Sequence, residues 1–212
     1  MVKRNIFLDY GELIAKQEFN RDTLYRAHNL ALDYLNSNHL NLVSLDNLAE
    51  SHHQVISRYL EARKDGTEWS MQRIISQVTG ALNISSSHVL PLVNIYKFND
   101  HDYSLLPDAR EVLLEIARSR KLGIISNLPH DSLINELEDF ELLDLFETIT
   151  ISGRVGYRKP HQAIYRVALA KAQVEPAEST FVSHDGEEVA GAERVGMEGI
   201  LVKSIKEVIG ML

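Results

Sequence analysis

The sequence predicts an α/β protein, in which helices flank a parallel sheet and a helical subdomain is inserted after the first strand. In the second half of the chain, short apolar runs alternate with helical periodicities of roughly 10–15 residues, as is typical of βαβ units. One further apolar run near the N-terminus is separated from these by a stretch with helical periodicity throughout. We therefore predict a sheet domain of residues 1–17 and 98–212 and a helical cap of residues 18–97.

Composition favours a folded enzyme or binding protein acting on a small molecule. The 212 residues, with 44% hydrophobic and 25% charged, are enough for one core with an inserted subdomain. The net charge of -8 argues against a nucleic-acid partner, and the absence of cysteine excludes a thiolate nucleophile or a zinc–thiolate site. The first apolar run is too short for a signal peptide or a membrane span. We expect a cytoplasmic protein without a membrane partner; the sequence indicates no oligomeric state.

The first predicted strand is the apolar run Ile6-Phe7-Leu8, which ends at Asp9. Gly11 follows two residues later. Parallel α/β sheets bind ligands at the carboxyl ends of their strands. Asp9 is therefore either a nucleophile or metal ligand held on a rigid strand, or a residue that only caps the strand.

The predicted cap has apolar residues at helical spacing from about residue 22 to residue 92, with breaks at 36–38 and 64–66. Two histidines, His28 and His52, lie at apolar positions of these helices, and we interpret them as core residues and not as ligands. Three aromatic residues are expected to pack the cap: Tyr25, Tyr59 and Trp69. Two arginines could reach a substrate anion: Arg21 and Arg73.

The second half predicts four more strands with helices between them. The strands cover residues 122–125, 149–151, 180–182 and 200–202, and helices are expected near 108–117, 130–137, 161–172 and 191–195. Polar residues follow the strand ends: Ser126 and Asn127, then Lys159, then the run 183–188. In a doubly wound sheet these ends meet Asp9 in one crevice. A carboxylate, a hydroxyl, an ammonium and an acidic cluster suit phosphoryl transfer.

At this point the chain resembles the haloacid dehalogenase-like hydrolase superfamily. The motifs that carry the resemblance are Asp9-Tyr10-Gly11, the strand ending in Ser126-Asn127, the segment 159–165 beginning Lys159-Pro160, and the segment 181–197. The resemblance implies a Rossmann-like core with a helical cap and places the chain nearest a branch with Asp-x-Gly in the first motif. That branch is similar to sugar-phosphate phosphatases and to the N-terminal domains of epoxide hydrolases.

The resemblance also implies the site. Asp9 would be the nucleophile that forms an aspartyl-phosphate, Lys159 the cation beside it, and Ser126 with Asn127 the phosphate ligands. The cofactor would be Mg²⁺, held by Asp9, the Gly11 carbonyl, Asp185 and Glu188. The partner would be a small phosphorylated metabolite.

Two residues depart from the pattern that this resemblance implies. Gly11 stands where most phosphatases of the superfamily have an acid–base aspartate, and His184 stands where the branch has a magnesium-binding aspartate. Histidine is a poor ligand for this hard cation, so Asp185 and Glu188 would replace it, unless they only cap the next helix. The leading hypothesis is a magnesium-dependent phosphatase. The alternatives are a metal-free 2-haloacid dehalogenase and a catalytically impaired binding or regulatory module.

Overall fold

The computed structural model describes residues 5–40 and 43–211, and the chain divides into two compact units. The sheet unit combines Met1–Gln17 with Tyr103–Leu212, and the helical unit is Glu18–Asp102. The first boundary between the units lies between Gln17 and Glu18. The second lies five residues after the predicted start of the sheet domain at 98, because helix α4 (Val89–Asn99) continues past that position.

In the described part of the chain, five parallel strands form the sheet of the sheet unit. They are β1 (Asn5–Leu8), β4 (Lys121–Ser126), β5 (Phe146–Ile151), β6 (Ser179–Ser183) and β7 (Glu198–Leu201), in the spatial order β5-β4-β1-β6-β7. From β1 the chain adds β4 and β5 on one side of the sheet and then β6 and β7 on the other, so the direction of strand addition reverses between β1 and β6. A sheet of this topology opens a ligand crevice at such a reversal, beyond the carboxyl ends of the strands.

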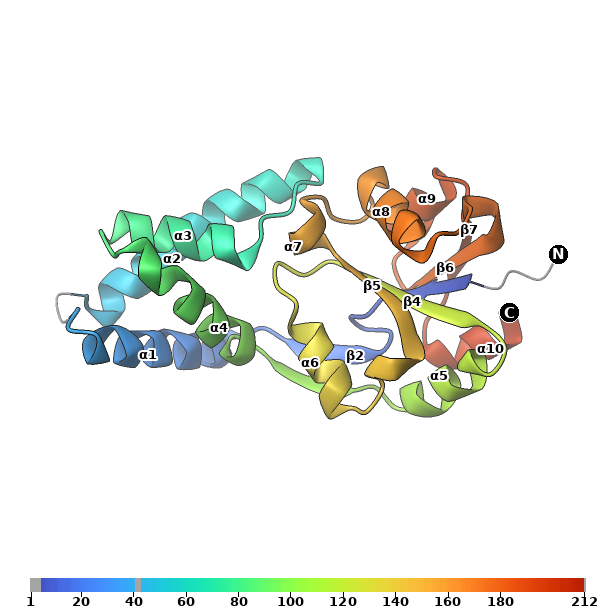
Figure 1. Ribbon diagram of the computed structural model, residues 1–212, viewed down its shortest axis with the longest axis horizontal. Helices are drawn as coiled ribbons and strands as arrows, with labels where there is room; N and C mark the ends of the chain where they lie inside the picture. Colours follow the sequence, from blue (N-terminus) through green and yellow to red (C-terminus); the bar gives the residue numbers. More distant parts are fainter. Residues whose placement is uncertain (1–4, 41–42, 212) are drawn as a thin grey trace. The chain divides into compact units, whose positions relative to one another are not determined.

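Alternate residues of β1 bury on opposite faces of the sheet, as the period of a strand requires. Ile6 and Leu8 belong to one apolar cluster, which includes residues of α5 (Ala109–Ala117) and α6 (Ser132–Asp139). Phe7 belongs to the other cluster, with residues of α8 (Gln162–Ala172) and α9 (Gly186–Glu193). Figure 1 shows α8 and α9 on one side of the strands and α5 on the other. The first strand is buried on both faces, so the residue that follows it is held rigidly.

In its described residues the helical unit contains four longer helices, and it has its own core. They are α1 (Arg21–Ser37), α2 (Leu45–Ala62), α3 (Met71–Ala81) and α4 (Val89–Asn99). The side chains of Asn20, Ser44 and Ser70 accept backbone hydrogen bonds and start the first three of these helices. The predicted breaks are confirmed, since α1 ends at Ser37 and Gly66 adopts a left-handed conformation after α2.

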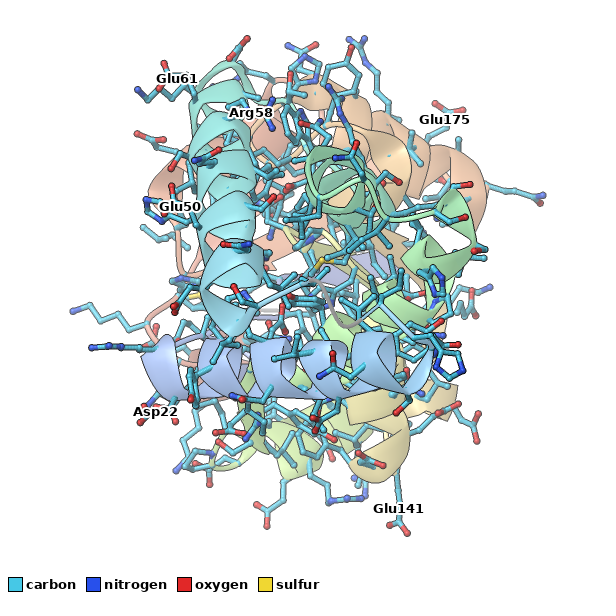
Figure 2. All side chains as sticks on the ribbon, turned by 90° about the vertical axis from the view of Figure 1, so that its left-hand side faces the viewer. Asp22, Glu50, Arg58, Glu61, Glu141 and Glu175 are labelled. Atoms are coloured by element: carbon cyan, nitrogen blue, oxygen red, sulfur yellow. The ribbon has the colours of Figure 1, made fainter. Side chains whose placement is uncertain are left out.

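Polar residues of α2 face solvent while its apolar residues enter the core. Figure 2 labels Glu50, Arg58 and Glu61 along this helix, and all three are exposed. Leu48 and Val55 on its other face are buried in the cluster of the helical unit. The amphipathic pattern that predicts helices in this region is therefore confirmed.

Several short elements lie outside the sequence prediction. The strands β2 (Ala15–Glu18) and β3 (Asp102–Leu105) pair with each other, and neither contains an apolar run. The remaining short elements are α7 (Ser152–Val155), α10 (Val208–Met211), and the 3₁₀ turns η1 (Arg63–Asp65), η2 (Ser86–His88), η3 (Leu143–Leu145), η4 (Pro176–Glu178) and η5 (Ile205–Glu207). Helix α9 begins at Gly186, earlier than predicted. None of the helices in the described residues has the length and apolarity needed to cross a bilayer.

Candidate active site

Asp9 lies directly after the central strand, at the reversal of strand order, and is 5% exposed. Its backbone N–H donates to Val182 O at 2.9 Å, so strand β6 fixes its main chain. The Tyr10 N–H donates to Asp9 Oδ1 at 2.8 Å. The next residue is anchored as well, because the Tyr10 hydroxyl donates to the buried Glu136 carboxylate at 2.8 Å. These contacts give the Asp9 carboxylate one orientation.

Lys159 contacts Asp9, as the sequence predicts. The residue is 2% exposed, and its ammonium pairs with Asp9 Oδ1 and lies 2.8 Å from Glu188 Oε2. The Asn127 side chain holds the lysine backbone from both sides: Lys159 N–H donates to Asn127 Oδ1 at 2.7 Å, and Asn127 Nδ2 donates to Lys159 O at 3.2 Å. One buried ammonium therefore joins two carboxylates, and its loss would leave both of them without this cation.

The segment around Lys159 packs closely against α9. A Cβ atom at Gly191 would lie 2.8 Å from the Pro160 carbonyl oxygen and 2.8 Å from the Tyr165 hydroxyl, so a glycine is needed there. Tyr165 also donates from its hydroxyl to Glu188 O at 2.6 Å. These contacts place α9 and the lysine at a fixed separation.

Glu188 points into the site from the first turn of α9 and is 8% exposed. Its Oε1 accepts from Asn127 Nδ2 at 3.0 Å. Its Oε2 accepts from Ser183 Oγ at 3.0 Å in addition to the Lys159 ammonium. Both carboxylate oxygens are therefore already bonded to donors of the sheet unit.

The loop after β6 approaches the other oxygen of Asp9. Ser183 Oγ lies 3.3 Å from Asp9 Oδ2, and His184 Nδ1 lies 3.4 Å from the same oxygen. The His184 side chain is 38% exposed, so it lies on the open side of the carboxylate. The sequence identifies His184 only as a departure from a metal-binding pattern and does not assign Ser183. The position of Ser183 at the end of a buried strand could have identified it as a site residue.

The charges of the cluster keep Asp9 ionised. Burial alone would raise the pKa of Asp9, but the Lys159 ammonium and the hydrogen bond from His184 hold it below its usual value. Burial opposes the charge of Lys159, yet Asp9 and Glu188 raise the pKa of the ammonium. Burial raises the pKa of Glu188 despite the attraction of Lys159. The contact with Asp9 raises the pKa of His184, against the effect of its partial burial.

Ser126 is the last residue of β4, which pairs with β1, and Asn127 follows it. Ser126 is 3% exposed at the end of that strand. The Asn127 side chain accepts a hydrogen bond from the Lys159 N–H and donates one to Glu188 Oε1. Their predicted role in binding phosphate stays a prediction.

The donors around Asp9 fit an inner-sphere Mg²⁺ poorly. This ion prefers six oxygen ligands in near-octahedral geometry. Glu188 has both oxygens engaged, and Asp185 Oδ1 accepts from the N–H groups of Glu187 and Glu188, which makes it the N-cap of α9. At position 184, next to Asp9 Oδ2, the chain offers an imidazole. The metal-ligand assignments of Asp9, Gly11, Asp185 and Glu188 stay predictions that this donor set does not favour.

Several residues considered for the site belong to the helical unit. Arg73 places its guanidinium 4.1 Å from the centre of the Trp69 ring, and Arg21 is exposed on α1. Trp69 and Tyr59 pack in the core of this unit, as predicted, whereas Tyr25 is 58% exposed. The two histidines His28 and His52 are buried core residues, as predicted.

The fold and the site together define a hydrolase of the doubly wound α/β class that carries a buried aspartate at the reversal of its sheet. The family model for haloacid dehalogenase-like hydrolases matches residues 21–202, so the chain belongs to this family. The superfamily and the fold class predicted from the sequence are thereby confirmed.

Solved structures of similar fold include a 2-haloacid dehalogenase from Pseudomonas syringae pv. tomato, with a TM-score of 0.67 and 17% identity over 99% of this chain and 97% of that one. A HAD phosphatase from Thermococcus onnurineus has a TM-score of 0.61 and 18% identity, over 98% of this chain and 97% of that one. Among curated proteins, glyceraldehyde 3-phosphate phosphatase from Pyrococcus furiosus is 32% identical over 100 residues. That match covers 46% of this chain and 42% of the relative, so the chain spans less than half the length of the relative it matches.

Proposed function

We propose that this hydrolase cleaves phosphate monoesters of small metabolites through a covalent aspartyl-phosphate on Asp9. The observation that carries the proposal is the Asp9 carboxylate itself, which is buried at the ligand-binding edge of the sheet and kept ionised by the Lys159 ammonium. The similarity to a glyceraldehyde 3-phosphate phosphatase supports a phosphorylated substrate.

The chemistry requires two displacements at phosphorus. An oxygen of Asp9 attacks, the bond from phosphorus to the ester oxygen breaks, and the leaving alcohol takes a proton from water. A water molecule then attacks the aspartyl-phosphate, which releases inorganic phosphate and restores the carboxylate. Lys159 stabilises the negative charge that gathers between nucleophile and phosphoryl group in both steps.

Gly11 affects which esters react well. An acid–base residue contributes on the order of 100-fold to 10,000-fold when it protonates a leaving group. Glycine provides no such group two residues after Asp9. We therefore expect aryl and acyl phosphates, whose leaving groups need little protonation, to be hydrolysed faster than alkyl phosphates.

The magnesium dependence predicted from the sequence does not form part of this mechanism. If an ion is bound, it would be held by Asp9 and the Gly11 carbonyl and would offset charge between nucleophile and phosphate. The engaged oxygens of Glu188 and the imidazole at position 184 argue against that arrangement.

A dehalogenase is the second candidate, and the imidazole of His184 in place of a carboxylate favours it, because attack of an aspartate on carbon requires no metal ligand. It would use the same Asp9 oxygen and would release a halide from a 2-haloacid. Phosphate release from a panel of phosphorylated metabolites, measured beside halide release from 2-haloacids, separates the two. Halide release without phosphate release would overturn the phosphatase proposal.

The Asp9→Asn variant tests the nucleophile. We expect turnover to fall by at least about 10,000-fold, because the amide is not a nucleophile that can form the acyl phosphate. Stability should change little, since Lys159 keeps Glu188 as its partner. Intact-mass spectrometry of the quenched parent enzyme should show the mass of one added phosphoryl group, and the variant should not. Asp144→Asn, the same exchange at an exposed aspartate, is the control. Turnover of Asp9→Asn within tenfold of the parent would exclude Asp9 as nucleophile.

A further inference from the structure

The two oxygens of Asp9 face different nitrogen donors. Oδ1 pairs with the buried ammonium of Lys159, and Oδ2 lies 3.4 Å from His184 Nδ1. The lysine is fully enclosed, whereas the histidine side chain is 38% exposed. A substrate entering the open side of the carboxylate would therefore meet the imidazole first.

The acidic residues that follow His184 do not contact the exposed oxygen of Asp9. Glu188 is directed toward Lys159, Ser183 and Asn127. Asp185 accepts the first amides of α9 through Oδ1. His184 is the side chain of this loop that contacts Asp9 from the exposed side. A cation bridging Asp9 and a substrate oxygen would need the space that the imidazole occupies.

We propose that the His184 imidazole replaces the divalent cation of the site. Its N–H group and the Lys159 ammonium then offset the repulsion between the Asp9 carboxylate and an anionic substrate, without a metal. The proposal rests on the proposed use of Asp9 as nucleophile. A single carboxylate in place of this ring would convert the site into a magnesium site, because Asp9 Oδ2 and the new carboxylate would then offer two hard oxygen ligands on the exposed side.

Magnesium titration by calorimetry tests the exchange directly. The parent and His184→Asp are titrated with Mg²⁺ in the presence of inorganic phosphate, and His161→Asp serves as the control. His161 is also an exposed histidine of the sheet unit, and aspartate can replace it as the N-cap of α8. We expect binding at millimolar Mg²⁺ by His184→Asp only. His184→Glu gives the same test with a longer carboxylate if the first variant unfolds.

Phosphate release from an aryl phosphate provides the second measurement. The parent should turn over at the same rate in EDTA and in Mg²⁺, within about twofold, while His184→Asp should lose at least about tenfold in EDTA. Magnesium binding by the parent as tight as that of His184→Asp would overturn the proposal. So would a parent that needs magnesium for turnover, or carboxylate variants that bind no more Mg²⁺ than His161→Asp. If no protein releases phosphate, the proposed function fails, and the calorimetry still decides what occupies the cation position.

Discussion

Lys159 sets the charge balance of the site, since one ammonium serves two buried carboxylates. Replacement by methionine would leave Asp9 and Glu188 facing each other without a cation. Breaking a buried ion pair in this way costs on the order of 3–5 kcal/mol. We expect Lys159→Met to be destabilised by about that amount in urea unfolding followed by circular dichroism, and to be inactive.

The double variant Lys159→Met with Glu188→Gln is the matched control. It removes one charge of each sign, and the glutamine oxygen can still accept from Asn127. We expect the double variant to be more stable than Lys159→Met alone, because the remaining carboxylate no longer faces a second one. A single variant as stable as the parent would show that the ammonium does not compensate these charges.

Gly11 is the other residue whose replacement tests the chemistry. A Cβ atom built there meets nothing within 4 Å, so Gly11→Asp has room for its side chain. The new carboxylate would stand where it can protonate a leaving alcohol. We expect kcat/KM for an alkyl phosphate to rise by at least about tenfold, with a smaller change for an aryl phosphate whose leaving group needs no proton. Equal effects on both substrates would contradict a role in proton transfer.

Sequence reasoning located the ends of the strands better than the contacts between side chains. The proximity of Asp9 and Lys159 is predicted from the convergence of strand ends and from the family resemblance, and the two side chains are in contact in the structure. The contacts of Ser183, His184 and Glu188 depend on where α9 starts. Because Asp185 caps that helix, Glu188 enters the site one turn into it and His184 stays in the loop above Asp9. Periodicity does not specify a helix start to one residue.

At the scale of elements, the strands of the main sheet are predictable because each contains a short apolar run. The pair β2 and β3 is not, since both are four-residue segments that are mostly exposed. In β2 the residues after Ala15 are all polar, and β3 has only Tyr103 and Leu105 as apolar residues. Pairing between residues far apart in sequence defines such strands, and their own composition does not.

The helices of the helical unit bury two histidines that affect its stability at acidic pH. His52 stacks on Tyr96 with ring centres 5.2 Å apart, and His28 meets the His52 ring edge-on at 5.0 Å. Burial lowers the pKa of His52 to about 4, with a further decrease from His28 and His53 and an opposing effect of Asp100. Burial also lowers the pKa of His28, whose Nε2 has no hydrogen-bond partner among the described residues. Both rings are therefore neutral in the folded state near neutral pH.

The helical unit should lose stability as pH falls from about 6.5 to about 4. In that range the unfolded chain takes up protons at its histidines while folded His52 does not, so protonation favours unfolding. The loss attributable to His52 is at most about 3 kcal/mol. Trp69 is the single tryptophan of the chain and lies in this unit, so its fluorescence follows the unfolding in urea at pH 7 and pH 5. His52→Phe should show a weaker pH dependence; an unchanged dependence would contradict the assignment.

At the scale of the whole molecule, the two units have separate apolar cores. The buried clusters of the sheet unit draw on residues 6–15 and 109–208, and the cluster of the helical unit draws on residues 27–96. The sequence predicts this division because a purely helical segment interrupts strands that alternate with helices. The end of the helical segment is harder to predict from sequence, because α4 has no Gly or Pro at its end.

Because the helical unit has its own apolar core, we expect it to fold without the sheet unit. Its helices have capping side chains at Asn20, Ser44 and Ser70, and α1 packs on α4 and α2 while α3 packs on α2 and α4. We expect a protein consisting of residues 18–102 to be helical by circular dichroism and to unfold cooperatively, with the Trp69 emission of the full chain.

The control for this fragment is Ala31→Asp, which places a carboxylate at a fully buried position of α1. A charge buried without a partner should unfold the fragment and shift the Trp69 emission to that of an exposed indole. If residues 18–102 of the parent sequence were unfolded, or melted without cooperativity, the cap would depend on the sheet unit for its structure. If the fragment folds, substitutions in the helical unit can be screened for stability in the fragment alone, apart from the chemistry at Asp9.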